Sequence, residues 1–155
     1  MVSNFTELGD RLLVIFDGRC GLCNRAVRWF LVRDRLDRLR FVASESPKVA
    51  ELLAKHGLGA PDADPEIKSG SPLRTILVVL DPGGPAERIL RRSDAVMALL
   101  WELPRPWPAV AVALRWILRP VRDLGYRLIA RWRYRIWGRL ESCPIPTAEE
   151  RTRFF

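Results

Sequence analysis

The sequence predicts an α/β fold, because short apolar runs typical of buried strands alternate with segments of helical periodicity. The first run, residues 12–16, is continuously apolar, as expected of a strand whose two faces are both covered. A helical pattern follows to about Asp37, and residues 39–43 give a second strand pattern. Ser46 and Pro47 then begin a second helical pattern, since proline favours the first turn of a helix. The predicted order is strand, helix, strand, helix.

The chain beyond this unit predicts a hairpin and a further helix. Residues 59–72 are rich in Pro, Asp, Ser and Gly and indicate a surface loop. Residues 75–80 carry the strongest strand pattern, and the turn at residues 81–85 can return the chain antiparallel through residues 87–90. Ser93 is expected to cap the helix that follows. We therefore expect a central sheet of the βαβ type that a hairpin extends and a helix flanks.

Prolines within residues 104–108 interrupt the helical pattern. They predict a boundary between a domain of residues 10–103 and an Arg- and Trp-rich helical extension, residues 104–155, which packs on it within a single folding unit. The apolar run at residues 109–118 is well short of the about 20 residues that a membrane-spanning helix needs. We therefore predict no transmembrane segment.

Residues 120–139 have helical spacing with two distinct faces. The apolar face carries Leu124, Leu128, Ile129, Trp132 and Ile136. The other face carries Arg122, Tyr126, Arg133 and Trp137. We expect the apolar face to pack on the domain and the second face, with its two aromatic residues, to lie in solvent. On this interpretation the arginine stems cover apolar surface while their charged ends reach water.

The net charge of +8 comes mainly from the C-terminal part of the chain. Residues 1–100 carry 15 basic against 13 acidic side chains, and residues 101–155 carry 11 against 5. This excess indicates an anionic partner. We expect an anionic or membrane-surface contact through Arg131, Arg133 and Trp137, and no nucleic-acid partner.

The three cysteines of the chain are too few for a disulfide scaffold. Residues 1–10 also lack the charged-then-apolar pattern of a signal peptide. We therefore expect a cytoplasmic, reducing location, where a Cys-x-x-Cys pair is more often catalytic or metal-binding than structural.

Cys20 and Cys23 lie where the first strand gives way to the first helix. Unpaired backbone N–H groups and the helix dipole favour a thiolate at a helix N-terminus, where a cysteine pKa falls from about 8.5 to roughly 3.5 to 7.5. Cys23, one turn further, would face inward and could attack a mixed disulfide held on Cys20. This arrangement predicts an exposed Cys20 sulfur, a buried Cys23 and dithiol–disulfide exchange.

Asp17 is the third catalytic candidate beside the two cysteines: it either caps the turn that begins at Gly18 or relays a proton for Cys23. Arg19, Gly18 and Thr75 are candidates for supporting roles, and Arg19 adds a cation beside Cys20. Thr75 is placed to approach Cys20 from the third strand.

A metal site is an alternative use of the Cys-x-x-Cys pair. Zinc normally takes four ligands, and the further candidates are Cys143 and His56, with no second pair of closely spaced ligands. His56 lies at the C-terminal end of a predicted helix, where an interaction with the helix dipole accounts for it without a catalytic or metal-binding role. The sequence favours no particular role for Cys143. We therefore expect neither a metal nor an organic cofactor.

Residues 17–24, Asp-Gly-Arg-Cys-Gly-Leu-Cys-Asn, resemble the Asp-x-x-Cys-x-x-Cys signature of the DCC family of thiol-disulfide oxidoreductases. Further parts of the same family resemble residues 91–95, residues 119–123 with Tyr126, residues 130–134, Gly138, and residues 143–146, so the resemblance covers nearly the whole chain, about residues 12–155. The resemblance implies a thioredoxin-like fold and a redox-active dithiol at Cys20 and Cys23, with Asp17 part of the signature.

One departure from ordinary thioredoxins concerns the residues before the third strand. Thioredoxins place a proline there that faces the dithiol, whereas this chain has Arg74 and Thr75. Our hypothesis is a thiol-disulfide oxidoreductase that exchanges its Cys20/Cys23 dithiol with a protein or small-molecule disulfide. The alternative is a non-catalytic interaction module that docks an anionic or membrane-surface partner through the basic C-terminal helices.

Overall fold

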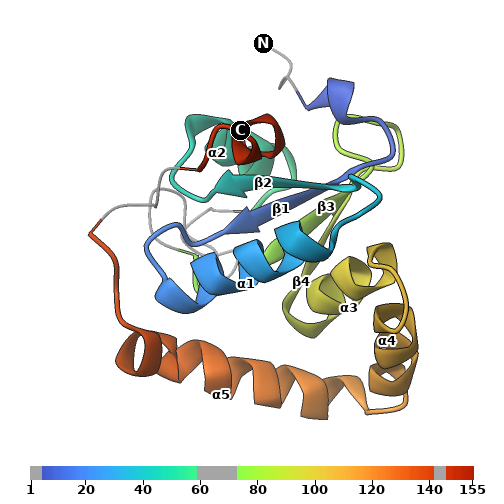
Figure 1. Cartoon of the computed structure of the whole chain (residues 1–155), viewed down its shortest axis with the longest axis vertical. Coiled ribbons are helices and arrows are strands. Elements are labelled where there is room, and N and C mark those ends of the chain that lie inside the picture. The colour runs from blue at the N-terminus through green and yellow to red at the C-terminus, as the bar shows by residue number, and fades with distance from the viewer. Residues whose placement is uncertain (1–4, 59–72, 142–145) are drawn as a thin grey trace.

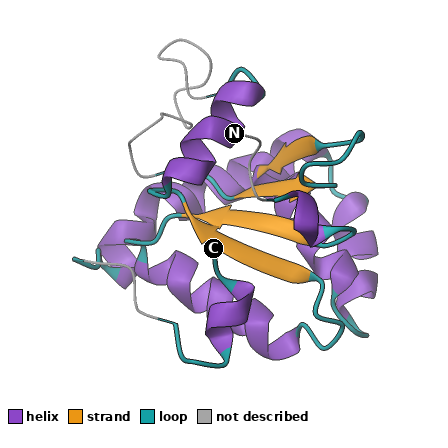
Figure 2. Cartoon of the chain, turned by 90° about the horizontal axis from the view of Figure 1, so that it is seen from above, coloured by secondary structure: helices purple, strands orange, loops and turns teal. Residues whose placement is uncertain are grey.

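A four-stranded mixed sheet lies at the centre of the computed structural model, which describes residues 5–58, 73–141 and 146–155 (Figures 1 and 2). The strands are β1 (Leu12–Phe16), β2 (Leu39–Ala43), β3 (Leu77–Leu80) and β4 (Arg88–Arg91). Their order across the sheet is β2-β1-β3-β4. β1 pairs parallel with β2 and antiparallel with β3, and β3 pairs antiparallel with β4. The βαβ unit and the hairpin predicted from the sequence are both present.

Helices cover both faces of the sheet (Figure 1). They are α1 (Gly21–Arg33), α2 (Pro47–Lys55), α3 (Arg92–Glu102), α4 (Trp107–Arg115) and α5 (Arg119–Trp137), with the 3-10 helices η1 (Thr6–Leu8) and η2 (Glu150–Arg153). Alternate residues of β1 enter two separate cores. Val14 packs with side chains of α1 and α3, while Ile15 packs with side chains of α2. The double cover explains why β1 is apolar throughout.

The arrangement of sheet and helices is thioredoxin-like, which confirms the predicted fold class. β1 and β2 have the predicted bounds, whereas β3 begins two residues later, at Leu77. The prediction that Ser93 caps α3 is wrong. Arg91 occupies the N-cap, and the Ser93 hydroxyl instead donates to Asp123 of α5. The loop expected at residues 59–72 lies outside the described residues.

The chain beyond Leu103 packs on the domain in two places. α4 and α5 lie against α3, and α5 also contacts α1. The last residues return to the β2 edge of the sheet, where the Phe155 N–H donates to the Phe41 carbonyl at 3.0 Å. The Phe154 ring lies 5.7 Å from the Phe41 ring and 6.4 Å from the Phe16 ring. The final residues thereby cover the open edge at β2.

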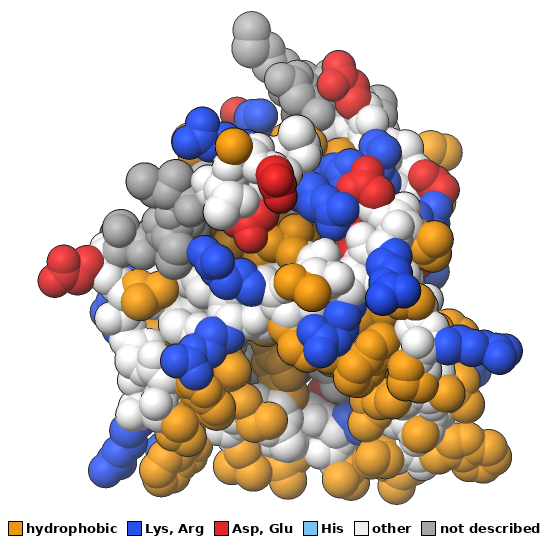
Figure 3. Space-filling view, in the orientation of Figure 1, with side chains coloured by type: hydrophobic (Ala, Val, Ile, Leu, Met, Phe, Trp, Pro, Cys, Tyr) orange, Lys and Arg blue, Asp and Glu red, His pale blue; other side chains and the backbone are white. Residues whose placement is uncertain are grey.

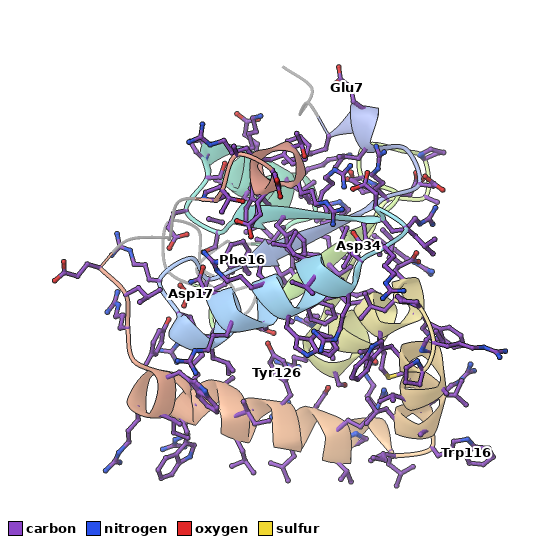
Figure 4. All side chains as sticks on the ribbon, viewed as in Figure 1. Glu7, Phe16, Asp17, Asp34, Trp116 and Tyr126 are labelled. Carbon is purple, nitrogen blue, oxygen red and sulfur yellow. The ribbon has the colours of Figure 1, made fainter. Side chains whose placement is uncertain are left out.

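The orientation of α5 is opposite to the sequence prediction. The apolar residues expected in the core, Leu124, Leu128, Ile129, Trp132 and Ile136, are all exposed. The residues expected in solvent point toward the domain or its edge, as the labelled Tyr126 does in Figure 4. The physical reason is that partners for polar groups lie on the domain: the Tyr126 hydroxyl accepts from the Ile76 N–H at 2.8 Å, and Arg133 contacts Asp17.

None of the helices within the described ranges is long and apolar enough to cross a membrane.

Candidate active site

The two thiols are held by a turn that joins β1 to α1. The Cys20 N–H donates to the Asp17 carbonyl at 3.2 Å, and the Arg19 N–H donates to Asp17 Oδ1 at 3.0 Å. Cys20 is the N-cap of α1, so its side chain faces the unpaired N–H groups of the first helical turn. Asp17 therefore caps the turn, which is one of the two roles that the sequence left open for it.

The hydrogen bonds of Cys20 stabilise its thiolate. Its Sγ accepts from the Cys23 N–H at 3.3 Å, and both cysteines are free thiols. A hydrogen bond from the Cys23 side chain, with this backbone bond and the charge of Arg133, lowers the pKa of Cys20 to about 6 against the opposing effect of burial. The same hydrogen bond and its own burial raise the pKa of Cys23 well above its usual value. At neutral pH the pair therefore holds one thiolate, on Cys20, and one proton, on Cys23.

Asn24 fixes the shape of the turn. Its Nδ2 donates to the Gly18 carbonyl at 2.8 Å and to the Cys20 carbonyl at 2.9 Å. The side chain thus ties the first turn of α1 back to the residues that precede it. Our sequence analysis gave Asn24 no role, although it is the last residue of the motif at residues 17–24.

A buried ion pair joins the turn to α5. Asp17 and Arg133 are 1% and 3% exposed, and Arg133 Nη2 lies 3.2 Å from Asp17 Oδ2. The same Nη2 donates to the Leu73 carbonyl at 2.6 Å. Tyr134 donates its hydroxyl to Asp17 Oδ2, and burial, followed by this bond, raises the pKa of Tyr134 to about 12. Both oxygens of Asp17 are therefore engaged, which favours a structural role over proton transfer.

The remaining predicted site residues lie around this centre. Arg19 is about half exposed, with its Nε 4.0 Å from Glu45 Oε1, whereas the cation that lowers the pKa of Cys20 is Arg133. Gly18 is buried and its carbonyl receives Asn24. Thr75 is buried and hydrogen-bonds with Tyr126 of α5. No local sequence signal connects residue 17 with residue 133, so sequence reasoning missed Arg133 and Tyr134 as parts of the site.

Residues 137–140, the C-terminal strap, cover the dithiol turn. The Leu140 N–H donates to the Arg19 carbonyl at 2.7 Å, and Cys20 forms an antiparallel bridge with Arg139. Cys20 is 0% exposed, while Cys23 is partly exposed. The expectation of an exposed Cys20 and a buried Cys23 is therefore wrong, because the strap adds cover to the helix N-terminus.

A cavity of about 540 Å³ adjoins the ion pair on the side of α5. The described residues that line it are Arg74, Tyr126, Arg127, Ala130, Arg131, Arg133 and Tyr134. Four of them are arginines and none is acidic, so the described part of the wall has a strongly positive charge.

Metal-ligating side chains do not gather in groups of three or more anywhere in the described ranges. His56 instead places its Nε2 2.7 Å from Glu87 Oε1. Cys143, the other ligand that the sequence suggested, lies outside the described residues.

A thioredoxin-like sheet that presents two unequal thiols at a helix N-terminus defines a dithiol protein of the thioredoxin-like class. The chain belongs to the DCC1-like thiol-disulfide oxidoreductase family, whose model matches residues 14–139. It is 34% identical to a chloroplastic DCC family protein of Arabidopsis thaliana over 92% of this chain and 74% of the relative. It is 29% identical to the uncharacterized protein YuxK of Bacillus subtilis over 96% of each chain. No solved structure matches the chain.

Proposed function

We propose that the protein is an enzyme that exchanges its Cys20/Cys23 dithiol with a substrate disulfide. The observation that supports this most strongly is the inequality of the two thiols, since one is held as a thiolate and its neighbour as a proton-bearing thiol. The thiolate is the nucleophile of disulfide exchange, and a nearby thiol is the group needed to resolve the product.

The first step is attack by the Cys20 thiolate on one sulfur of the substrate disulfide. A bond forms between Cys20 Sγ and that sulfur, the substrate S–S bond breaks, and the other substrate sulfur leaves as a thiolate that takes up a proton. The backbone N–H of Cys23, 3.3 Å from Cys20 Sγ, holds the nucleophile in place.

The second step resolves the mixed disulfide. Cys23 loses its proton and attacks Cys20 Sγ, which forms the Cys20–Cys23 disulfide and releases the second substrate sulfur as a thiol. Two electrons pass from the protein to the substrate, and the reverse sequence oxidises a substrate dithiol. The pKa of Cys23 falls at this stage, because the thiolate that hydrogen-bonds it and raises its pKa is gone.

The test is trapping in a Cys143→Ser background, with glutathione disulfide as the probe. Cys23→Ser should hold one glutathione on Cys20 as a stable mixed disulfide, and the matched Cys20→Ser variant should hold far less. The protein with both cysteines should instead form the intramolecular disulfide, detected as a mass loss of two hydrogens. A reduced protein that never forms this disulfide would contradict the proposed function.

The positive cavity beside Arg133 favours a substrate with negative charge near its disulfide. Glutathione disulfide should therefore react faster than the uncharged bis(2-hydroxyethyl) disulfide, and added salt should narrow the difference. Equal reaction rates for the two disulfides at low salt would show that the cavity does not select the substrate. They would not contradict the proposed thiol exchange. The cytoplasmic location expected from the sequence remains part of the proposal and is not needed by the mechanism.

A further inference from the structure

The outer face of α5 is an apolar stripe that nothing in the described structure covers. The stripe consists of Val121, Leu124, Leu128, Ile129, Trp132 and Ile136, which are between 47% and 62% exposed. Figure 3 shows hydrophobic side chains gathered along the lower edge of the molecule, over α4 and α5. Trp116 and Leu118, in the turn between these helices, are 86% and 74% exposed and extend the stripe at one end. So much contiguous apolar surface marks an interaction site.

The outward orientation of the stripe is determined by specific contacts on the opposite face of the helix. The opposite face of α5 is held to the domain by specific polar contacts: Tyr126 with Ile76, Asp123 with Ser93, and Arg133 with Asp17. These contacts fix the rotation of the helix about its axis. The apolar stripe therefore stays directed outward.

Basic side chains accompany the stripe. Residues 107–139 contain eight arginines and a single acidic residue, Asp123, which is turned inward to Ser93. Arg127, Arg131 and Arg135 are exposed and follow one another at a spacing of four residues. This spacing places them in a row along one side of the helix, beside the stripe. Asp94 of α3 pairs with Arg119 and Arg122, and Asp17 pairs with the buried Arg133. The positive character of the outer surface therefore comes mainly from the row of three exposed arginines.

We propose that this surface docks α5 flat on an anionic lipid bilayer. A helix of 19 residues is about 28 Å long, and its apolar side chains would enter the headgroup region while the arginine row pairs with lipid phosphates. Trp116 and Trp132 suit the same level, since tryptophan favours the boundary between headgroups and acyl chains. The apolar stripe lies on the side of α5 away from Asp17, while Arg127 and Arg131, at the flank of the helix, also line the cavity beside the ion pair. Docking through the stripe leaves the contact between Asp17 and Arg133 in place.

The surface fits a membrane better than a second copy of the chain. A symmetric pairing of two α5 helices would bring both arginine rows to one interface without acidic partners, and like charges there oppose association. An anionic bilayer supplies the opposite charge.

The test is flotation of the full chain with phosphatidylcholine vesicles that contain or lack phosphatidylglycerol. We expect binding to the anionic vesicles, weak binding to the neutral ones, and loss of binding at high salt. Leu128→Glu should lower the partition coefficient by about tenfold or more. The matched control is Leu36→Glu, which makes the same change at a residue 67% exposed outside the stripe and should bind as the original chain does.

The arginine row is tested with Arg127, Arg131 and Arg135 all changed to Gln, which should weaken binding roughly a hundredfold. The control changes Arg25, Arg28 and Arg35 to Gln, so the net charge falls equally at exposed positions elsewhere. Equal loss in both triple variants would show that net charge, not this surface, drives binding.

Equal binding to both vesicle types, or none to either, would overturn the proposal. So would a dimer in sedimentation equilibrium that Leu128→Glu dissociates, since the stripe would then join two copies. Binding does not involve the thiols, so Cys20→Ser should float as well as the original chain. Failure here is therefore distinguishable from failure of the proposed disulfide exchange.

Discussion

At the scale of the residue, two cysteines that are three positions apart have opposite protonation behaviour. Cys20 accepts hydrogen bonds from Cys23, and this lowers the pKa of the acceptor and raises that of the donor. Arg133 adds a positive charge from α5, 113 residues further along the chain. The nucleophile is therefore defined jointly by a local turn and by a distant helix.

Cys23→Ala tests how much the local turn contributes to the low pKa of Cys20. The alanine removes the side-chain hydrogen bond that contributes most to the low pKa of Cys20, so the pKa should rise from about 6 toward the usual value of about 8.5. Cys23→Ser retains a donor and should give a smaller rise. Thiolate absorbance at 240 nm against pH, in a Cys143→Ser background, measures both. Identical pKa values in the two variants would contradict the role assigned to this hydrogen bond.

Arg133→Gln tests the contribution of α5, which is distant in sequence, to the low pKa of Cys20. The change leaves Asp17 buried without its cation and should cost about 3 to 5 kcal/mol of unfolding free energy in urea denaturation. It should also raise the pKa of Cys20, because the positive charge that favours the thiolate is lost. Arg131→Gln, two residues earlier at an exposed position, is the control and should change the stability by less than about 0.5 kcal/mol. A purely structural role for Arg133 would leave the thiol titration unchanged.

At the scale of the element, the sequence predicted the strands and the first helices because their signals are local. Residues 39–43 form β2 as predicted, and Cys20 begins α1 from a turn that its own neighbours specify. The orientation of α5 could not be predicted in the same way. Periodicity identifies two faces of a helix, but the contacts of Tyr126 with Ile76 and of Arg133 with Asp17 decide which face turns inward.

The strap at residues 137–140 also had no periodic signal. Its turn depends on Gly138, whose φ of 75° is open to glycine and strained for other residues. The strap then approaches Gly21 closely, since a Cβ there would lie 2.4 Å from the Trp137 carbonyl oxygen. Sequence alone does not show that two glycines far apart in the chain allow one backbone to lie on another.

Gly21→Ala should displace the strap, because the added methyl group meets a backbone atom that has no alternative rotamer. We expect a loss of about 1 to 3 kcal/mol in unfolding free energy and faster alkylation of Cys20 by iodoacetamide. Gly125→Ala is the matched control: its Cβ would meet nothing within 4 Å, and the helix should gain about 0.5 to 1 kcal/mol. Unchanged alkylation in Gly21→Ala would show that the strap does not limit access to the thiolate.

At the scale of the whole molecule, the site joins parts of the chain that lie far apart in sequence. The turn after β1 supplies the thiols, α5 supplies Arg133 and Tyr134, and the strap supplies the cover. Unfolding separates these parts, so the pKa of Cys20 must return to its ordinary value in the unfolded chain. The protonation of a single thiol is thereby coupled to the stability of the fold.

This coupling predicts how the stability of the reduced protein depends on pH. The folded pKa of Cys20, about 6, lies below the unfolded value of about 8.5, so its thiolate stabilises the fold fully above pH 8.5 and loses this effect as the pH falls through 6. The difference corresponds to about 3 kcal/mol. The raised pKa of Cys23 has the opposite effect on stability, but only above the pKa that this thiol has in the unfolded chain. The informative window is therefore pH 6 to 8.5. In urea denaturation, the unfolding free energy of the reduced protein should rise with pH across this window. The rise should exceed that of Cys20→Ser and of the oxidised protein, in which Cys20 cannot titrate. If the unfolding free energy depended on pH in the same way in all three proteins, the folded structure would not be stabilising the thiolate.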